Sequence, residues 1–179
     1  MYPVIRMIWQ LYQHRNAPHL PLTGTHVSHH YCLPWDIDLW RELNNGRTLT
    51  LYDLGRIPLA GRVGLIGVLR RERWGLTMAG ASVRYRRRVR MFDRVEMRSR
   101  LIGWDSRFMY LEQSMWTTHG DCASHVLYRA AVTGRAGIVP TAEVLAALGQ
   151  DHAEPPPLPA WVRAWIAAED TRPWPPMQE

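Results

Sequence analysis

The chain has 179 residues, of which 46% are hydrophobic and 10% aromatic, and its formal net charge at pH 7 is +6. This length suits one domain whose core buries about 70% of the surface of the unfolded chain, and the composition excludes a disordered protein. All 22 basic residues are arginine. The positive charge favours polyanionic partners, namely nucleic acids, acidic membranes or phosphorylated cofactors.

The cysteines and the N-terminal segment indicate where in the cell the protein is expected. Cys32 and Cys122 form neither a disulfide framework nor a metal motif, so a cytoplasmic location is the simplest expectation. The apolar run Met1–Tyr12 is shorter than the ~20 residues that span a bilayer, and it lacks a signal-peptide pattern. We interpret it as a helix or arm that packs on the domain or on a partner subunit. Membrane contact through this run is the less favoured alternative.

The first regular elements are a strand and a helix. Residues Thr25–Leu33 alternate in polarity, as a strand does. Asn44 precedes an apolar run and is a helix N-cap signal, because its side-chain oxygen can accept an otherwise unpaired backbone N–H. The apolar residues from Asn45 onward are spread around the helix axis, which is typical of a helix buried on most sides. We expect Pro58 to break this helix, with a second short helix near Val63–Glu72.

Four further strands are expected as two hairpin-like pairs, because turn signals separate the apolar runs. The pairs are Thr77–Arg90 with Arg94–Gly103, around a turn at 91–93, and Phe108–Thr118 with Ser124–Arg135, around a turn at 119–121. Strict alternation in Val95–Leu101 predicts that one face of its strand is solvated.

The C-terminal third is predicted to be helical. Thr141–Leu148 reads as a short helix capped by Thr141, and Leu158–Glu169 as a final amphipathic helix after a proline spacer. We therefore expect a single domain over residues 1–179. Its core covers about residues 24–140, followed by a helical extension at 141–169 and a loose tail at 170–179.

The stretch before the central helix carries the strongest chemical signal. Asp36 and Asp38 stand two residues apart, shortly before the expected helix start. A helix N-terminus offers free N–H groups and partial positive charge, so it binds anions and polarises carbonyl oxygens. A carboxylate beside it can act as a base or nucleophile while the N–H groups hold the developing oxyanion. The pattern therefore outlines an acyl-transfer site.

The spacing D-x-D-x-x-x-x-x-N-N, from Asp36 to Asn45, resembles the signature of hotdog-fold acyl-CoA thioesterases of the 4-hydroxybenzoyl-CoA thioesterase type. That signature reads roughly D-x-D-x-x-x-H-x-N-N-x-x-Y, so Glu42 and Thr48 replace the usual His and Tyr. The likeness covers about residues 24–167. At the LIGWD stretch, residues 101–105, it is greatest to the branch that contains thioesterase superfamily member six.

The resemblance implies an α+β hotdog fold, in which a curved antiparallel sheet of five or six strands wraps around a central helix. It also implies an enzyme that hydrolyses thioesters of coenzyme A or acyl carrier protein without a metal or other cofactor. Binding of acyl thioesters without turnover, as a sensor or scaffold, is the alternative. The resembled proteins pair their sheets edge to edge, so we expect a homodimer or homotetramer.

The site residues follow from the same resemblance. Asp38 would be the general base or the nucleophile, and the backbone N–H groups of Asn45 and Gly46 would hold the thioester carbonyl. Asn44 would cap the helix, and Asp36 would shape the loop. Glu42 either supplies a second carboxylate or is an exposed loop acid.

The basic run Arg84–Arg90 has three interpretations. On a strand, its alternate arginines would share one face, where Arg86 and Arg88 could bind the phosphates of coenzyme A. A solvated strand end is the interpretation favoured over coenzyme A binding. Nucleic-acid binding ranks last and is not expected, because no nucleic-acid motif accompanies the run. A metal site at the nearby histidines is not expected either, because strand residues four apart, such as His26 and His30, lie ~13 Å from each other.

Overall fold

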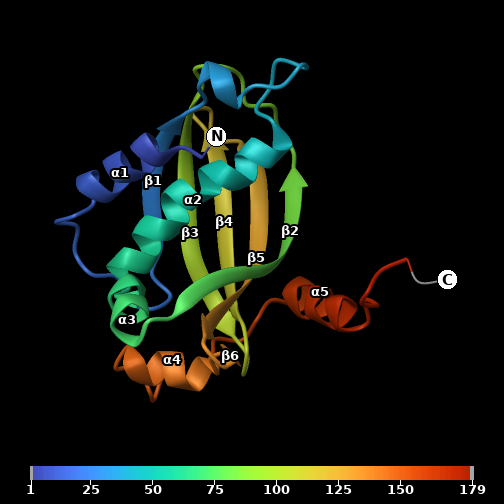
Figure 1. The fold of residues 1–179 in the computed structure, drawn as a ribbon. Coiled ribbons are helices and arrows are strands. Elements are labelled where there is room, and N and C mark those ends of the chain that lie inside the picture. Colours follow the sequence, from blue (N-terminus) through green and yellow to red (C-terminus); the bar gives the residue numbers. More distant parts are fainter. Residues whose placement is uncertain (1, 178–179) are drawn as a thin grey trace.

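The computed structural model describes residues 2–177 (Figure 1). Its helices are α1 (Val4–Gln13), α2 (Asn45–Arg62), α3 (Leu65–Glu72), α4 (Thr141–Ala147) and α5 (Ala160–Asp170), with a short 3-10 turn at Pro34–Asp36. Its strands are β1 (His26–Tyr31), β2 (Gly75–Tyr85), β3 (Arg94–Trp104), β4 (Met109–Thr117), β5 (Cys122–Gly134) and β6 (Gly137–Ile138).

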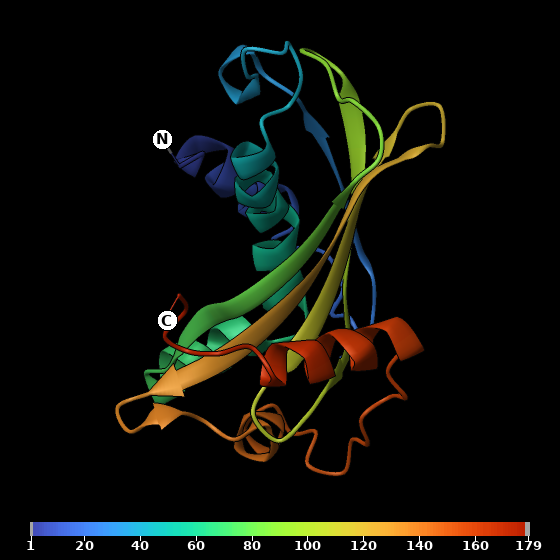
Figure 2. The ribbon, with the colours of Figure 1, turned by 90° about the vertical axis from the view of Figure 1, so that its right-hand side faces the viewer.

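The strands form one antiparallel sheet in the order β1-β3-β4-β5-β2, and β6 pairs with β5. Figures 1 and 2 show that the sheet curls around α2, whereas α5 lies across its other face. Val162 of α5 is fully buried there in a cluster with Phe108, Tyr110 and Leu127. The sheet around a central helix is the arrangement that the resemblance implies.

Pairing at the sheet edge corrects one expectation. β2 and β3 do not form a hairpin, because β2 pairs with β5, where Ala81 lies opposite Tyr128. β2 ends at Tyr85 and does not continue to Arg90, because the N–H groups of Arg86 and Arg87 both donate to the carbonyl of Ala123. The chain then crosses the end of the sheet to reach β3. The β4–β5 hairpin and the solvated face of Val95–Leu101 are confirmed.

Helix α2 is buried on most sides, as the spread of its apolar residues indicated. Leu51, Tyr52 and Leu54 are each at most 1% exposed. The expected break at Pro58 is wrong, because α2 continues through this buried residue to Arg62. The chain turns instead at Gly64, whose φ of +85° costs a glycine little, and α3 begins directly afterwards.

The N-terminal helix packs on the domain, through the buried Met7 and Gln10. Within residues 2–177, the structure has no helix long and apolar enough to cross a bilayer. Another expected detail is wrong: Thr141 does not cap α4, because its hydroxyl donates to the carbonyl of Asp105 and Pro140 occupies the N-cap position.

Candidate functional site

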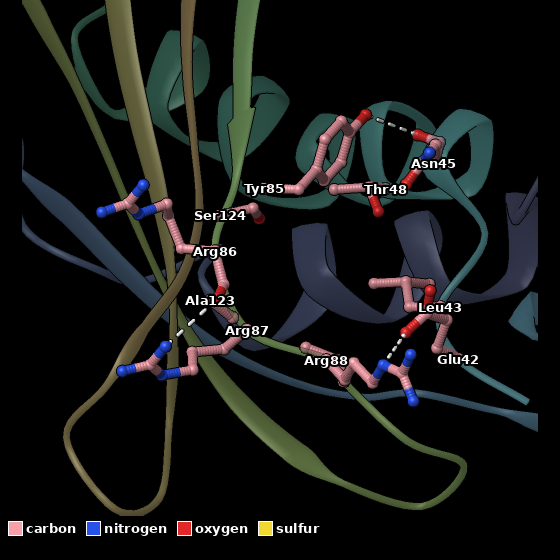
Figure 3. A pocket seen from close by; sticks show the side chains of 11 residues that line it. Glu42, Leu43, Asn45, Thr48, Tyr85, Arg86, Arg87, Arg88, Ala123 and Ser124 are labelled. Atoms are coloured by element: carbon pink, nitrogen blue, oxygen red, sulfur yellow. Dashed lines mark hydrogen bonds and ion pairs between the residues drawn. The ribbon is translucent and has the colours of Figure 1, made fainter.

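An open hollow lies at the N-terminus of α2 (Figure 3). The end of β2, the start of β5 and the loop before α2 border it. Its lining residues are Glu42, Leu43, Asn45, Thr48, Tyr85, Arg86, Arg87, Arg88, Val89, Ala123 and Ser124. The hollow therefore combines a helix N-terminus, a carboxylate and three arginines.

The first turn of α2 is arranged to offer hydrogen-bond donors. The side-chain oxygen of Asn44 accepts the N–H of Arg47 at 3.1 Å, which confirms the expected N-cap. The backbone N–H groups of Asn45 and Gly46 donate no hydrogen bond within the part of the chain that the structure describes. Such unpaired N–H groups at a helix start bind anions or carbonyl oxygens.

Tyr85 and Ser124 line the hollow although no local pattern marked them. They lie opposite each other in the β2–β5 pair, and the hydroxyl of Tyr85 donates to the carbonyl of Asn45 at 3.1 Å. Burial raises the pKa of Tyr85, so this hydroxyl stays a donor. Ser124 bonds the hydroxyl of the buried Tyr52 at 2.9 Å. The pairing of β2 with β5 brings these two residues to the start of α2. The sequence of one strand does not show which other strand it will pair with.

Asp36 is a fully buried ion-pair centre. Its two oxygens lie 2.7 Å from Arg6 of α1 and 2.7 Å from Arg47 of α2, and it also accepts the N–H of Leu33 at 3.1 Å. Burial by itself would raise the pKa of this carboxyl, but the hydrogen bonds from Arg47, Leu33 and Arg6 outweigh it and lower the pKa. Asp36 is absent from the lining of the hollow. Its geometry fits the loop-shaping role expected for it.

Asp38 and Glu42 face each other across a tight turn. The N–H of Asp38 donates to the carbonyl of Glu42 at 2.9 Å, and Oδ1 of Asp38 accepts the N–H of Trp40 at 2.8 Å. Asp38 is not among the lining residues, whereas Glu42 is. Glu42 also binds Nε of Arg88 at 2.8 Å, as Figure 3 shows.

The arginine run does not have the strand geometry expected for it. Residues after Tyr85 lie outside β2, so Arg86 and Arg88 do not share a strand face. In Figure 3, Arg88 points toward Glu42, whereas Arg86 and Arg87 extend to the opposite side. All three still line the hollow. Within residues 2–177, no group of three His, Cys, Asp or Glu side chains is placed to hold a metal ion.

The fold is shared with solved thioesterase structures. A DHNA-CoA thioesterase from Staphylococcus aureus has a TM-score of 0.64 at 8% identity and covers 81% of this chain and 95% of its own. A hypothetical protein of the same species, solved in complex with CoA, has a TM-score of 0.61 at 9% identity over 80% and 95%. The structure therefore has the hotdog fold.

Sequence relatives support the same grouping. Protein THEM6 of Xenopus laevis is 32% identical over 140 residues, which are 78% of this chain and 66% of the relative. Protein THEM6 of Drosophila melanogaster is 34% identical over 97 residues, or 54% and 50%. The chain thus spans between half and two thirds of the length of these relatives. The family model of the thioesterase-like superfamily matches residues 32–166, so the chain belongs to this superfamily.

Proposed function

We propose that this protein hydrolyses acyl thioesters of coenzyme A or acyl carrier protein at the N-terminus of α2. The observation that carries the proposal is that the N–H groups of Asn45 and Gly46, which have no partner among the described residues, lie beside a hollow lined by arginines. Membership of the thioesterase-like superfamily supports it. So does the name of a relative, thioesterase lcsJ of Purpureocillium lilacinum, 27% identical over 54% of this chain and 41% of its own.

In this proposal the thioester carbonyl accepts hydrogen bonds from Asn45 and Gly46, which stabilise the oxyanion that forms on attack. Asp38 either removes a proton from the attacking water or attacks the carbonyl itself. On the first route water bonds to the carbonyl carbon, the C–S bond breaks, and the leaving thiolate takes up the proton that Asp38 removed. On the second route the C–S bond breaks as the acyl group passes to Asp38 as an anhydride. Water then hydrolyses this anhydride, which releases the acid, restores Asp38 and supplies the proton that the thiolate takes up. Oδ1 of Asp38 is held by the turn, so Oδ2 is the atom assigned to the reaction.

Asp38→Asn tests this role. Asparagine keeps an Oδ1 that can accept the N–H of Trp40, so the turn should survive while the negative charge is lost. General-base assistance is worth about 10²–10⁴ in rate. We therefore expect the hydrolysis of an acyl-CoA panel, followed by thiol release, to fall at least 10²-fold. Binding of a non-hydrolysable acyl-CoA analogue should persist.

Variants of other carboxylates serve as controls and distinguish the role of Asp38 from theirs. Asp93→Asn changes another turn acid, whose Oδ2 accepts the N–H of Arg90, and should leave hydrolysis unchanged. Asp36→Asn would remove the buried negative charge that Arg6 and Arg47 both bind, so its losses would report on folding. If Glu42→Gln abolishes turnover while Asp38→Asn does not, the reacting carboxylate is Glu42 and the role given to Asp38 is wrong.

Binding without turnover is the second candidate function. Glu42 stands where the resembled signature has His, and Arg88 neutralises its charge in the ion pair. Equally slow hydrolysis by the unchanged protein and Asp38→Asn, with tight analogue binding by both, would establish the binding function and contradict the enzyme.

A further inference from the structure

Two loops form one end of the molecule, and we refer to them together as the loop end. They are residues 32–44, between β1 and α2, and residues 86–93, between β2 and β3 (Figures 1 and 2). Backbone hydrogen bonds join them: Leu43 N–H donates to the carbonyl of Val89 at 2.8 Å, and Phe92 N–H to that of Cys32 at 2.7 Å. The loop end is therefore one connected surface, and the hollow at α2 opens between its loops.

Large apolar side chains project from the loop end into solvent. Leu39 is 95% exposed, Trp40 77%, Trp35 67% and Phe92 62%. Leucines elsewhere in the protein are buried, since Leu51 and Leu54 are at most 1% exposed. Exposed aromatic and leucine side chains gathered on one surface mark a site of interaction with a partner or membrane.

The same surface is cationic. Arg41, Arg86, Arg87, Arg88 and Arg90 are exposed on the two loops. Each acidic residue of the loops is already engaged. Asp36 is buried between arginines, Glu42 binds Arg88, and Asp38 and Asp93 accept backbone N–H groups within their own turns.

Backbone strain occurs in both loops. Arg41 has a φ of 60° and Phe92 a φ of 69°, values that are unfavourable for residues other than glycine and asparagine. Such strained positions cluster where the strain serves function. Here each strained residue also presents one of the two side-chain types, guanidinium or aromatic, that make up the surface.

We propose that the loop end docks onto the surface of a bilayer that contains anionic lipids. Tryptophan and other aromatic side chains favour the headgroup level of a membrane, where Trp35, Trp40 and Phe92 would lie. The guanidinium groups of Arg41 and Arg90 would contact lipid phosphates, since basic side chains near an anionic leaflet gain from its potential. Docking in this pose sets the mouth of the hollow against the membrane. The inference does not rest on turnover, because vesicle binding is measured without substrate.

Vesicle flotation tests the proposal. The full chain should float with vesicles of phosphatidylcholine and phosphatidylserine, bind phosphatidylcholine alone more weakly, and release as salt rises. Arg41→Gln with Arg90→Gln should lower partition into the anionic vesicles roughly 10-fold or more, at a few-fold per charge. Leu39→Ser with Trp40→Ser should lower partition into both kinds of vesicle. Phe92→Asn should do the same, and asparagine suits the positive φ, so folding should not suffer.

Matched controls lie elsewhere on the molecule. Arg135→Gln with Ile138→Ser changes an exposed arginine and an exposed apolar residue at the other end of the sheet, and should bind vesicles as the unchanged chain does. Absence of flotation by the unchanged chain at low salt would overturn the proposal. So would loss of binding in Ile5→Ser with Ile8→Ser on α1 while the loop variants still bind. Dissociation of an oligomer by Leu39→Ser with Trp40→Ser, without effect on flotation, would assign the loop end to a second copy instead.

Discussion

The arginines that follow β2 differ in what their side chains contact. Nε of Arg88 lies 2.8 Å from Glu42, whereas the guanidinium of Arg86 has no carboxylate partner within residues 2–177. Both side chains are exposed and both residues line the hollow. They are therefore placed for a ligand that carries phosphates, although not on the regular strand face first expected.

Replacing Arg86 and Arg88 together with Gln tests their role toward coenzyme A. If these arginines bind the phosphates of the nucleotide in both ground state and transition state, KM should rise far more than kcat falls. The effect should shrink for short pantetheine thioesters, which lack the nucleotide. Steady-state kinetics with a short-chain acyl-CoA and its pantetheine counterpart would show this, and equal losses on both would mean that the run is structural.

Helix α2 lies close against the sheet at Gly55. A Cβ built on this glycine would lie 2.7 Å from Sδ of Met97 and 2.7 Å from Oγ of Ser99, closer than real atoms approach. A Cβ on Gly61, in the same helix, would meet nothing within 4 Å. The two glycines thus share helix propensity but differ in surroundings.

Gly55→Ala and Gly61→Ala should change stability in opposite directions. Alanine is favoured over glycine in a helix by about 1 kcal/mol, so Gly61→Ala should raise the free energy of unfolding by up to that amount. At Gly55, crowding against β3 should cost about 1–3 kcal/mol and outweigh the gain. Urea unfolding of both variants measures the two changes in the free energy of unfolding. Stabilisation at both sites would mean that the side chains of β3 move aside to accommodate the new methyl group.

Strand β1 buries its polar side. His26 is 0% exposed and His30 4%, whereas Val27 and Tyr31 face outward. Burial lowers the pKa of His26 to about 4, with His14, directly after α1, and Arg62 of α2 beside it adding to the effect. Burial also lowers the pKa of His30 to about 3, with Arg6 of α1 next in effect and then His26, His29 and His14.

These histidines predict a loss of stability under mild acid. Below about pH 6.5 the unfolded chain takes up protons that the folded chain binds only near pH 4 or below. The free energy of unfolding should therefore fall as pH falls from 6.5 towards 4, by up to about 1.4 kcal/mol per pH unit for each histidine. The carboxyl of Asp36, whose pKa is lowered, loses its contribution only at more acid pH.

Urea unfolding between about pH 7.5 and pH 5 measures this slope above the range in which carboxyls titrate. His26→Gln should flatten the slope, whereas His29→Gln, on the outer side of β1, should leave it in place. Constant stability over this range would contradict the assignment of buried neutral histidines.

At the scale of the whole molecule, one edge of the sheet is open. β2 has 11 residues and pairs only with β5 in the part of the chain that is described. A long open edge is an aggregation liability unless another strand or element covers it. Edge-to-edge pairing of two copies would remove that liability.

We therefore predict a homodimer or a dimer of dimers in solution. Multi-angle light scattering at micromolar concentration should give at least twice the mass of the chain. A monomer throughout that range would contradict both the oligomer and any site shared between subunits.

Local sequence was sufficient for much of this protein. Alternation located β1 and β3, because side chains of a strand point to opposite faces with a period of two. Asn44 and Asn45 marked the start of α2 through the chemistry of capping, and the two aspartates marked the loop beside it. These features depend on neighbours within a few residues, which one sequence contains.

Only the tertiary structure decided which strands pair, where α2 ends and which side chains reach the hollow. The pairing of β2 with β5, and not with β3, depends on contacts between residues about 40 positions apart, such as Tyr85 and Ser124. Packing keeps Pro58 inside α2, against the local preference of proline. The same long-range contacts bury Asp36 between two arginines and place Glu42, and not Asp38, in the lining of the hollow, because burial depends on which elements meet in space.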